Sequence, residues 1–361
     1  MFRTALFLLA VTAAAPARAD HDTAASILGS WKRAEPRLHI LRPAKHVRAL
    51  PESADKAAVE RVAGPARSFL SDTLAVVMIE NGALIFEGYS NGASKDAPLR
   101  SYSMAKSMTA LAVGEALCAG KIKSLDDKAS VYVTALEGTA YGAASVRNLL
   151  RYTSGAQDPG GDGYSGLHSE ADYRAMIFYS MSLLDLLKKY GQPGPSKQGD
   201  KFVYNGLDSE ALGVVVRAAT GMPLQRWFEE TVWQKAGGEF RAGWYRDRDG
   251  NGIAQAYVLA TARDFARIGL YTLERLTGRA DDPCVSGFLR EAIMPQVQKG
   301  YWASAPAFGL GVHTGADGDP WFLGHGGQRI GINTKTGRVF ATNGFKQWRT
   351  FDSNAQSLLA R

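Results

Sequence analysis

Strand-like segments lie near both ends of this 361-residue sequence, and the middle of the chain is mostly helical. Near the N-terminus, two apolar, β-rich runs at 74–79 and 83–87 flank Asn81-Gly82, a pair of residues typical of a tight hairpin turn. Near the C-terminus, further strands are predicted at 308–312, 321–323, 328–332 and 338–341. Strands from both ends around a helical insert predict an α+β fold, with an antiparallel sheet formed from the N- and C-terminal segments and flanked by helices.

Helical periodicity fills much of the sequence between these strands. One long helix is predicted to begin near residue 103 and to end at Gly120, because glycine favours the turn that follows a helix. Other helices are predicted near 145–151, 171–190, 207–220, 261–270 and 350–361. Residues 20–70 are rich in proline and alanine and predict irregular structure. We therefore expect a single catalytic domain over residues 20–361, with an α/β part at about 20–100 and 255–361 and an inserted helical part at about 101–254.

The first 19 residues have the pattern of a cleavable export signal. Arg3 gives a positive start, residues 5–15 are apolar, and Ala17-Arg18-Ala19 is a small-x-small cleavage site. No later stretch reaches the roughly 18 uncharged apolar residues that suggest a spanning helix. We therefore expect a signal peptide at 1–19 with cleavage after Ala19, a periplasmic or secreted protein, and no stable insertion into the membrane.

Charge and composition exclude several classes of function. The formal net charge is +7, but lysine and arginine are scattered and form no basic stripe, so we expect no nucleic-acid partner. Cysteine and histidine do not cluster at metal-ligand spacing, so no metal site is predicted. Cys118 and Cys284 either form a disulfide, which export permits, or remain two separate buried thiols.

The chemistry of the chain is suggested by Ser103-Met-Ala-Lys106, at the start of the long predicted helix. A serine hydroxyl is a weak nucleophile at neutral pH and needs a proton acceptor beside it. Side chains three residues apart lie on the same face of a helix, so Ser103 and Lys106 can point together. One large group of serine hydrolases arranges its nucleophile and base in this way, which predicts a covalent acyl-enzyme on Ser103.

Four further segments accompany this motif, in an order that resembles the serine β-lactamase and penicillin-binding-protein superfamily. The five segments, within residues 65–350, are Ser103–Lys106, Asn148–Gly155, Phe202–Gly213, Leu259–Asp264 and Gly324–Ile330. The second of them has Tyr152 where the family has histidine. A lone Ser-x-x-Lys occurs often by chance, whereas five segments in family order do not. The resemblance is to the class C-like branch, which includes carboxylesterases and 6-aminohexanoate-dimer hydrolases, and it implies a β-lactamase/transpeptidase-like fold.

The resemblance also implies roles for three side chains. Ser103 would attack the carbonyl carbon of the substrate. Lys106 would take or relay the serine proton, which requires its pKa to fall from the usual value of about 10.4 through burial and neighbouring groups. Tyr204 matches the family's catalytic tyrosine and would pass a proton to the leaving amine or alkoxide.

Two departures from the family pattern concern substrate binding. The family has asparagine two places after the tyrosine, whereas this chain has Gly206, preceded by Asn205 as a candidate substrate contact. The sequence Lys335-Thr-Gly337 matches the family's third motif, but it lies where two predicted strands need a turn. We therefore interpret Lys335 as a solvated hairpin residue outside the site.

Two registers are open for the third motif. Either His325-Gly-Gly takes its place directly, or residues 322–324 do so and the backbone N–H of His325 joins that of Ser103 as an oxyanion hole. Both registers bring His325 to the site, with Gly326 and Gly327 as candidate substrate contacts. Removing one preorganised donor of this kind raises the barrier by about 2.7–4 kcal/mol in a known example.

The remaining sequence features add little to this functional prediction. Asp247–Gly252 begins like a calcium-binding EF-hand loop but has Val258 where the bidentate glutamate is needed, so a turn is expected. Tyr164, in a glycine-rich loop, is a candidate substrate contact. The chain has no Gly-x-Ser-x-Gly nucleophile elbow and no His-Glu-x-x-His zinc motif.

These features predict an exported serine hydrolase that cleaves an ester or amide bond through acylated Ser103. Its substrate is expected to be a small-molecule ester, amide or peptide-like compound, without a cofactor and without an obligate protein partner. A β-lactamase or a D-alanyl-D-alanine carboxypeptidase is the alternative enzyme. The missing third-motif lysine and Gly206 argue against it, because both absent side chains would help to hold an anionic amide substrate. A relative that binds ligand without turnover is the remaining alternative.

Overall fold

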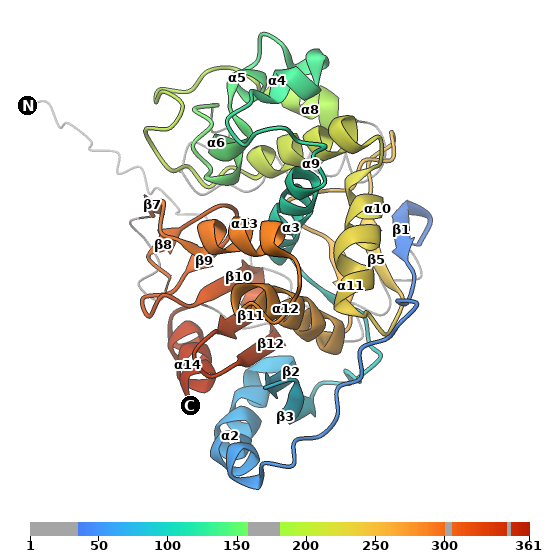
Figure 1. Ribbon diagram of the computed structural model, residues 1–361, viewed down its shortest axis with the longest axis vertical. Coiled ribbons are helices and arrows are strands. Elements are labelled where there is room, and N and C mark those ends of the chain that lie inside the picture. Colours follow the sequence, from blue (N-terminus) through green and yellow to red (C-terminus); the bar gives the residue numbers. More distant parts are fainter. Residues whose placement is uncertain (1–34, 158–180, 300–304, 345–347) are drawn as a thin grey trace, which may run out of the picture.

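The computed structural model describes residues 35–157, 181–299, 305–344 and 348–361. Within these ranges, helices and two antiparallel sheets form the α+β architecture predicted from the sequence (Figure 1). The expected signal peptide at 1–19 and the candidate contact Tyr164 lie outside the described residues. None of the described helices is long and apolar enough to cross a membrane.

The larger sheet joins the two ends of the chain. In order across the sheet, its strands are β3 (Ala83–Tyr89), β2 (Thr73–Glu80), β12 (Arg338–Gly344), β11 (Gln328–Asn333), β10 (Pro320–Gly324), β9 (His313–Thr314), β8 (Ala307–Phe308) and β7 (Val297–Gln298). The N-terminal hairpin lies beside the C-terminal meander because β2 pairs antiparallel with β12, which confirms the predicted sheet. The single strand predicted at 308–312 is wrong: β8 ends at Phe308 and β9 begins at His313, with Gly311 in the left-handed region between them.

The β2–β3 hairpin turns at Asn81 and Gly82, which have φ values of 50° and 87°. Two successive residues with positive φ make the mirror-image turn whose twist matches that of paired strands. Asparagine and glycine adopt this region at less cost than other residues. The local sequence therefore determines this turn.

Helices cover both faces of the larger sheet, which explains why β2 is apolar at nearly every position. Val77 packs in the main core, together with residues of α12 (Ala262–Leu276). Its neighbour Val76 packs in a second core with α2 (Lys56–Phe69) and α14 (Trp348–Ala360). Successive strand side chains point to opposite faces, so a strand covered on both sides reads as one continuous apolar run.

One central helix, α3, is buried along almost its whole length (Figure 1). A helix with neighbours on every side has no polar, solvent-facing stripe, and the few polar side chains of α3, such as Lys106 and Glu115, are buried as well. It ends as predicted, with Gly120 at φ 65° just beyond it. The described helices between residues 101 and 254 are α3 (Met104–Cys118), α4 (Ala129–Tyr132), α5 (Ala140–Ala143), α6 (Val146–Leu150), α8 (Leu183–Lys189), α9 (Gly206–Thr220), α10 (Leu224–Phe228) and α11 (Gln234–Ala236). Further along the chain, α13 (Pro283–Ile293) follows α12.

A second, smaller sheet contains strands that the sequence did not indicate. Strand β1 (Leu38–Leu41) pairs with β5 (Ala242–Tyr245), far along the chain. With β6 (Val258–Ala260) and β4 (Leu99–Arg100), they form a sheet in the order β1-β5-β6-β4. The expectation of irregular structure over 20–70 is therefore wrong for β1 and for α2. Strands this short carry too few residues for alternation to be visible, and their partners are distant in sequence.

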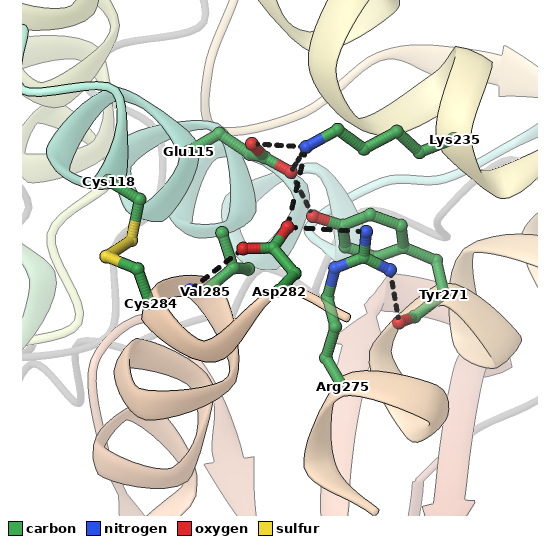
Figure 2. The surroundings of a disulfide bond; sticks show 8 residues. All are labelled: Glu115, Cys118, Lys235, Tyr271, Arg275, Asp282, Cys284 and Val285. Atoms are coloured by element: carbon green, nitrogen blue, oxygen red, sulfur yellow. Dashed lines mark hydrogen bonds and ion pairs between the residues drawn. A yellow bond between two sulfur atoms is a disulfide. The ribbon is translucent and has the colours of Figure 1, made fainter. Parts of the chain in front are cut away.

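The two cysteines form the disulfide, the first of the two alternatives open from the sequence (Figure 2). Cys118 is the last residue of α3, and Cys284 lies in the first turn of α13. One turn earlier on α3, the carboxylate of Glu115 accepts hydrogen bonds from Tyr271 Oη at 2.5 Å and Lys235 Nζ at 2.7 Å. These contacts hold one end of α3 in place, while the candidate nucleophile lies at the other end.

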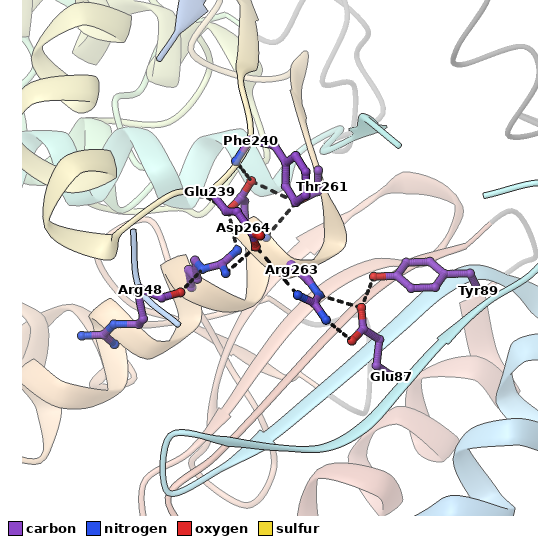
Figure 3. Close-up of polar contacts among 9 residues, drawn as sticks. Arg48, Glu87, Tyr89, Glu239, Phe240, Thr261, Arg263 and Asp264 are labelled. Atoms are coloured by element: carbon purple, nitrogen blue, oxygen red, sulfur yellow. Dashed lines mark hydrogen bonds and ion pairs between the residues drawn. The ribbon is translucent and has the colours of Figure 1, made fainter. Parts of the chain in front are cut away.

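The family-like segment at 259–264 has a structural role (Figure 3). Thr261 is the N-cap of α12, and its hydroxyl oxygen accepts the backbone N–H of Asp264 at 3.1 Å. The buried carboxylate of Asp264 accepts two backbone N–H groups from the loop before β5. Arg263 forms a bidentate pair with Glu87 on β3, at 2.7 and 2.6 Å. The start of α12 is thus tied both to the smaller sheet and to the larger one.

The loop that begins like a calcium-binding motif is a turn, as expected. Asp247 is fully buried, and its carboxylate accepts the backbone N–H groups of Leu183, Asp249 and Asn251 at 2.7–2.9 Å. N–H donors therefore take up the oxygens that a cation would need. The carboxylate links the turn to the start of α8.

Candidate active site

Ser103 and Lys106 lie together at the N-terminal end of α3. Ser103 is the N-cap residue and Lys106 belongs to the first turn, so helical spacing brings both side chains to one face. Lys106 Nζ lies 3.0 Å from Ser103 Oγ, within hydrogen-bonding distance. Ser103 is half-buried, whereas only 5 % of Lys106 is exposed. A partly accessible hydroxyl therefore contacts an amine that is withdrawn from water.

The surroundings of Lys106 lower its pKa to about 7. Burial is the main cause, because a low-dielectric environment disfavours the charged ammonium. The nearby carboxylate of Glu210 acts in the opposite direction and limits the fall of the lysine pKa. Lys106 Nζ also donates to the backbone carbonyl of Gln255 at 2.9 Å. With a pKa near neutrality, the amine can serve as an uncharged base at physiological pH.

Glu210 on α9 is completely buried, and no sequence pattern indicated its importance. Its carboxylate oxygens accept the backbone N–H groups of Ala254 and Gln255, at 2.8 and 3.3 Å. Because the carbonyl of Gln255 accepts from Lys106, Glu210 fixes the backbone segment that holds the lysine. Burial raises the pKa of Glu210 to about 7, while the N–H donors and Lys106 oppose this rise.

Tyr204 lies beside Lys106, in the loop that leads into α9. The Lys106 Nζ is 5.0 Å from the centroid of the Tyr204 ring. The tyrosine is 5 % exposed, and its ring centroid lies 5.5 Å from that of Tyr152 and 6.4 Å from that of Phe202. Lys106 thus contacts both Ser103 and Tyr204, and Tyr152, which has the place of the family's histidine, packs against the tyrosine.

His313 on β9 is a second buried residue that the sequence did not single out. Its ring centroid lies 6.2 Å from that of Tyr204, and its Nδ1 lies 2.8 Å from Lys299 Nζ. Burial lowers the pKa of His313 well below its usual value, and the positive charge of Lys299 adds to the effect. A neutral imidazole therefore packs beside Tyr204. A two-residue strand carries no pattern by which this contact could be foreseen.

The end of β10 lies against the start of α3. A Cβ added at Gly324 would be 2.4 Å from the carbonyl oxygen of Ser101 and 3.2 Å from the backbone nitrogen of Ser103, so only glycine permits this approach. Residues 322–324 belong to the strand itself. Of the two registers for the third motif, the strand position favours 322–324, with His325 as the first residue beyond it.

His325 begins a single 3₁₀ turn, η5 (His325–Gly327). Its side chain is exposed and meets the ring of Tyr102 edge-on, with a centroid separation of 5.7 Å. Gly326 and Gly327 have φ values of 70° and 97°, which a residue with a side chain rarely adopts. The imidazole of His325 therefore lies at the surface. The backbone N–H of His325 directly follows Gly324, the residue of β10 that lies against the start of α3.

The structure also bears on two other expectations from the sequence, that Lys335 lies outside the site and that Asn205 contacts the substrate. Lys335 is exposed in the turn between β11 and β12, as predicted, where the side-chain oxygen of Asn333 accepts its backbone N–H. Asn205 is only 1 % exposed and is the N-cap of α9. Its Oδ1 accepts the N–H of Leu207, and its Nδ2 donates to Tyr141 Oη. A substrate contact by Asn205 is therefore not supported, because its amide starts the helix instead.

A groove of about 1060 Å³ lies elsewhere, between α2 and β3. Its charged side chains have both signs, and neither Ser103 nor Lys106 lines it. In the part of the chain that the structure describes, no group of three or more histidine, cysteine, aspartate or glutamate side chains could hold a metal ion. Among the described residues, the N-terminal end of α3 is therefore the candidate active site, since Ser103 and Lys106 are in contact there.

The sequence profile described as "Beta-lactamase" matches residues 70–359 of this chain, a span that includes Ser103, Lys106 and Tyr204. The chain belongs to the β-lactamase family. It thus shares a family with serine hydrolases, and the resemblance seen in the sequence motifs is confirmed. No curated protein sequence matches the chain.

Solved structures with this fold include hydrolases of several kinds. A Bacillus anthracis protein assigned as a 6-aminohexanoate-dimer hydrolase is similar with a TM-score of 0.75 and 23 % identity over 92 % of each chain. EstCE1, a hydrolase with promiscuous acyltransferase activity, has a TM-score of 0.69 and 16 % identity, over 85 % of this chain and 100 % of its own. A class C β-lactamase variant has a TM-score of 0.59 and 14 % identity, over 86 % and 99 % of the two chains. At these identities the likeness concerns the fold alone.

Proposed function

We propose that this β-lactamase-family chain is an exported serine hydrolase that cleaves an ester or amide bond through an acyl-enzyme on Ser103. One observation carries the proposal: Lys106 Nζ is 3.0 Å from Ser103 Oγ, and burial lowers the lysine pKa to about 7. A nucleophile in contact with its base is the minimum that this chemistry needs. The hydrolases among the structural neighbours support the same reaction class.

In the acylation step, uncharged Lys106 accepts the proton of Ser103 Oγ while that oxygen bonds to the carbonyl carbon. The carbonyl electron pair moves onto its oxygen, and the backbone N–H groups of Ser103 and His325 stabilise the oxyanion. The first N–H groups of a helix have no acceptor inside the helix, which suits that of Ser103 to this role. Tyr204 passes the proton to the departing alkoxide or amine as its bond to carbon breaks. Water then attacks the acyl carbon and gives a proton to the same groups. The bond between that carbon and Ser103 Oγ breaks, the proton passes to Oγ, and the carboxylic acid product leaves.

The substrate is proposed to be a small ester, amide or peptide-like molecule. Strand β10 has no lysine, because Lys335 lies in the turn between β11 and β12. Gly206 has no side-chain amide at the position where the family has asparagine. Both changes remove groups that would hold an anionic amide substrate. Ester or small-amide hydrolysis is therefore favoured over β-lactam or cell-wall peptide cleavage.

Export is part of the proposal. The first 19 residues have a signal-peptide pattern, and Cys118 is bonded to Cys284. Disulfides persist mainly in oxidising compartments such as the periplasm or the extracellular space. The disulfide therefore supports a periplasmic or secreted location.

The test is to treat the purified protein and its Ser103→Ala variant with a fluorophosphonate probe and with labelled penicillin, and to assay short-chain p-nitrophenyl esters and linear amides. We expect fluorophosphonate labelling and ester turnover that both require Ser103. Labelling without Ser103 dependence, or no turnover by either protein, would leave a ligand-binding relative as the better description. Stable penicillin labelling with slow release would instead indicate the cell-wall reaction.

Replacing Glu210 by glutamine is expected to move the acid limb of the pH–rate profile to lower pH. Turnover needs uncharged Lys106, so kcat should rise with pH through the lysine pKa, which is about 7 in the wild type. The carboxylate of Glu210 raises that pKa, so a neutral side chain lets it fall and activity persists to lower pH. The measurement is kcat against pH for Glu210→Gln and for Glu210→Asp, which keeps the charge.

The plateau of the profile should also fall in Glu210→Gln, because an amide cannot accept both N–H groups that the carboxylate accepts. A lower plateau with an unmoved acid limb would mean that Glu210 only supports the backbone. Glu210→Asp should keep the acid limb near its wild-type position.

A further inference from the structure

The turn between β10 and β11 is held by a side chain at its own end. Gln328, the first residue of β11, pairs with Gly324 across the turn, and His325 and two glycines with positive φ lie between them. The glycines offer no side chain to fix the turn, and the imidazole of His325 is exposed. The buried Gln328 instead donates from Nε2 to the carbonyl oxygens of His325 and Gly344, both at 2.8 Å. The Gln328 amide therefore sets the position of His325.

The start of α3 is held by a second buried amide. Asn343 on β12 donates from Nδ2 to the carbonyl oxygen of Arg100 at 3.1 Å. Arg100 is the last residue of β4 and lies three residues before Ser103. The residue between them that follows β4, Ser101, exchanges two hydrogen bonds with the backbone of Val258 on β6. The contact from Asn343 therefore joins the larger sheet to the smaller one just before the nucleophile.

The two amides also bind each other. A primary amide has two N–H donors, and Asn343 Nδ2 donates to Gln328 Oε1 at 3.1 Å as well as to Arg100. We call Gln328 and Asn343 the amide bridge. Its hydrogen bonds run without interruption from the carbonyl of Arg100 to the carbonyl of His325. The bridge thus connects the two backbone segments whose N–H groups form the proposed oxyanion hole.

Stability alone does not explain the choice of asparagine at position 343. Asn343 Oδ1 is buried and has no hydrogen-bond partner among the described residues. An unpaired buried carbonyl oxygen costs stability, and such a group in a folded protein calls for an explanation. A leucine of similar size would avoid this cost, but it could not donate to both acceptors. The asparagine amide is therefore suited to joining the two segments.

We propose that the amide bridge fixes the separation between the backbone N–H groups of Ser103 and His325, so that Gln328 and Asn343 are positioning residues for the reaction at Ser103. An oxyanion hole is effective because its donors are in place before the negative charge develops. Donors on two different segments need a rigid connection between those segments, and the bridge provides it. This inference rests on the proposed function, since it concerns the same acyl transfer.

The first test is Asn343→Leu, which keeps a similar shape and removes both donor contacts. We expect kcat for a p-nitrophenyl ester to fall about tenfold to 100-fold with little change in KM, because the donors are displaced rather than lost. Affinity for phenylboronic acid, which forms a tetrahedral adduct with a serine hydroxyl, should fall by a similar factor. Gln328→Met should have the same effects. The double variant should lose about as much as the larger single loss, since either change breaks the whole bridge.

Asn333→Leu is the matched control. Asn333 is also buried and lies at the other end of β11, where its Oδ1 accepts the N–H groups of Lys335 and Thr336. The same substitution there should lower the melting temperature and leave kcat and boronic acid affinity unchanged. Wild-type kcat in Asn343→Leu, an equal loss of kcat in Asn333→Leu, or single losses that multiply in the double variant would overturn the inference.

A second test observes the amide bridge without the chemistry. In ¹H–¹⁵N NMR spectra, Asn343→Leu should shift the backbone amide signal of His325, and Gln328→Met should shift that of Ser103, because the bridge links each amide to the other segment. Asn333→Leu should move neither signal. Both shifts without ester turnover by the wild type would sink the proposed function and support the bridge. Ester turnover with both signals unmoved would support the function and overturn the bridge.

Discussion

Replacing Lys106 by methionine is expected to lower kcat for ester hydrolysis by about 10²–10⁴-fold, the range of a lost general base. Methionine keeps an unbranched, apolar side chain in a site where only 5 % of the residue is exposed, but it removes the amine that contacts Ser103 Oγ at 3.0 Å. Without that amine the serine keeps its proton and remains a weak nucleophile. The measurement is kcat and KM for a p-nitrophenyl ester, with circular dichroism to verify the fold.

Lys335→Met is the matched control, since it makes the same change at the exposed lysine of the sequence that mimics the third motif. It should leave kcat unaltered. The roles assigned here are wrong if Lys106→Met retains wild-type kcat, or if Lys335→Met shows the greater loss. A greater loss in Lys335→Met would mean that the hairpin turn, and not the first turn of α3, supplies the base.

Replacing Gly324 by alanine is expected to lower kcat about 10²–10³-fold, as the loss of an oxyanion donor does elsewhere. The new Cβ would lie 2.4 Å from the carbonyl oxygen of Ser101 and 3.2 Å from the backbone nitrogen of Ser103. Both are backbone atoms, so the end of β10 and the start of α3 must move apart. The N–H groups of Ser103 and His325, which form the proposed oxyanion hole, would then shift relative to each other, which is expected to weaken binding of the transition state more than binding of the substrate. The loss should therefore appear in kcat rather than in KM.

Gly287→Ala is the control for this prediction. Gly287 lies in α13, and a Cβ there would meet no atom within 4 Å. Alanine at an unstrained helical position should leave kcat unchanged and slightly raise the melting temperature. A Gly324→Ala protein with wild-type kcat would show that the register with residues 322–324 beside Ser103 is incorrect.

The parts of the fold that were predictable depend on neighbours in the sequence. Asn81-Gly82 favours a tight turn whatever surrounds it, and the hairpin formed there. The helix of residues 104–118 and its end before Gly120 followed from periodicity and from the residue after the helix. By contrast, β1 was not predictable, because its stability comes from pairing with β5 across most of the chain.

Within the site, the sequence alone determined that Ser103 and Lys106 share a face, because helical geometry brings residues three apart together. Only the tertiary structure decided the surroundings of this pair. Burial lowers the pKa of Lys106, and the contact from Glu210 to the backbone at Gln255 joins segments that no local pattern connects. Packing of distant segments likewise placed the end of β10, and not Lys335, beside the serine. Chain geometry sets local spacing, whereas burial and long-range contacts set pKa and position, and these exist only once the chain has folded.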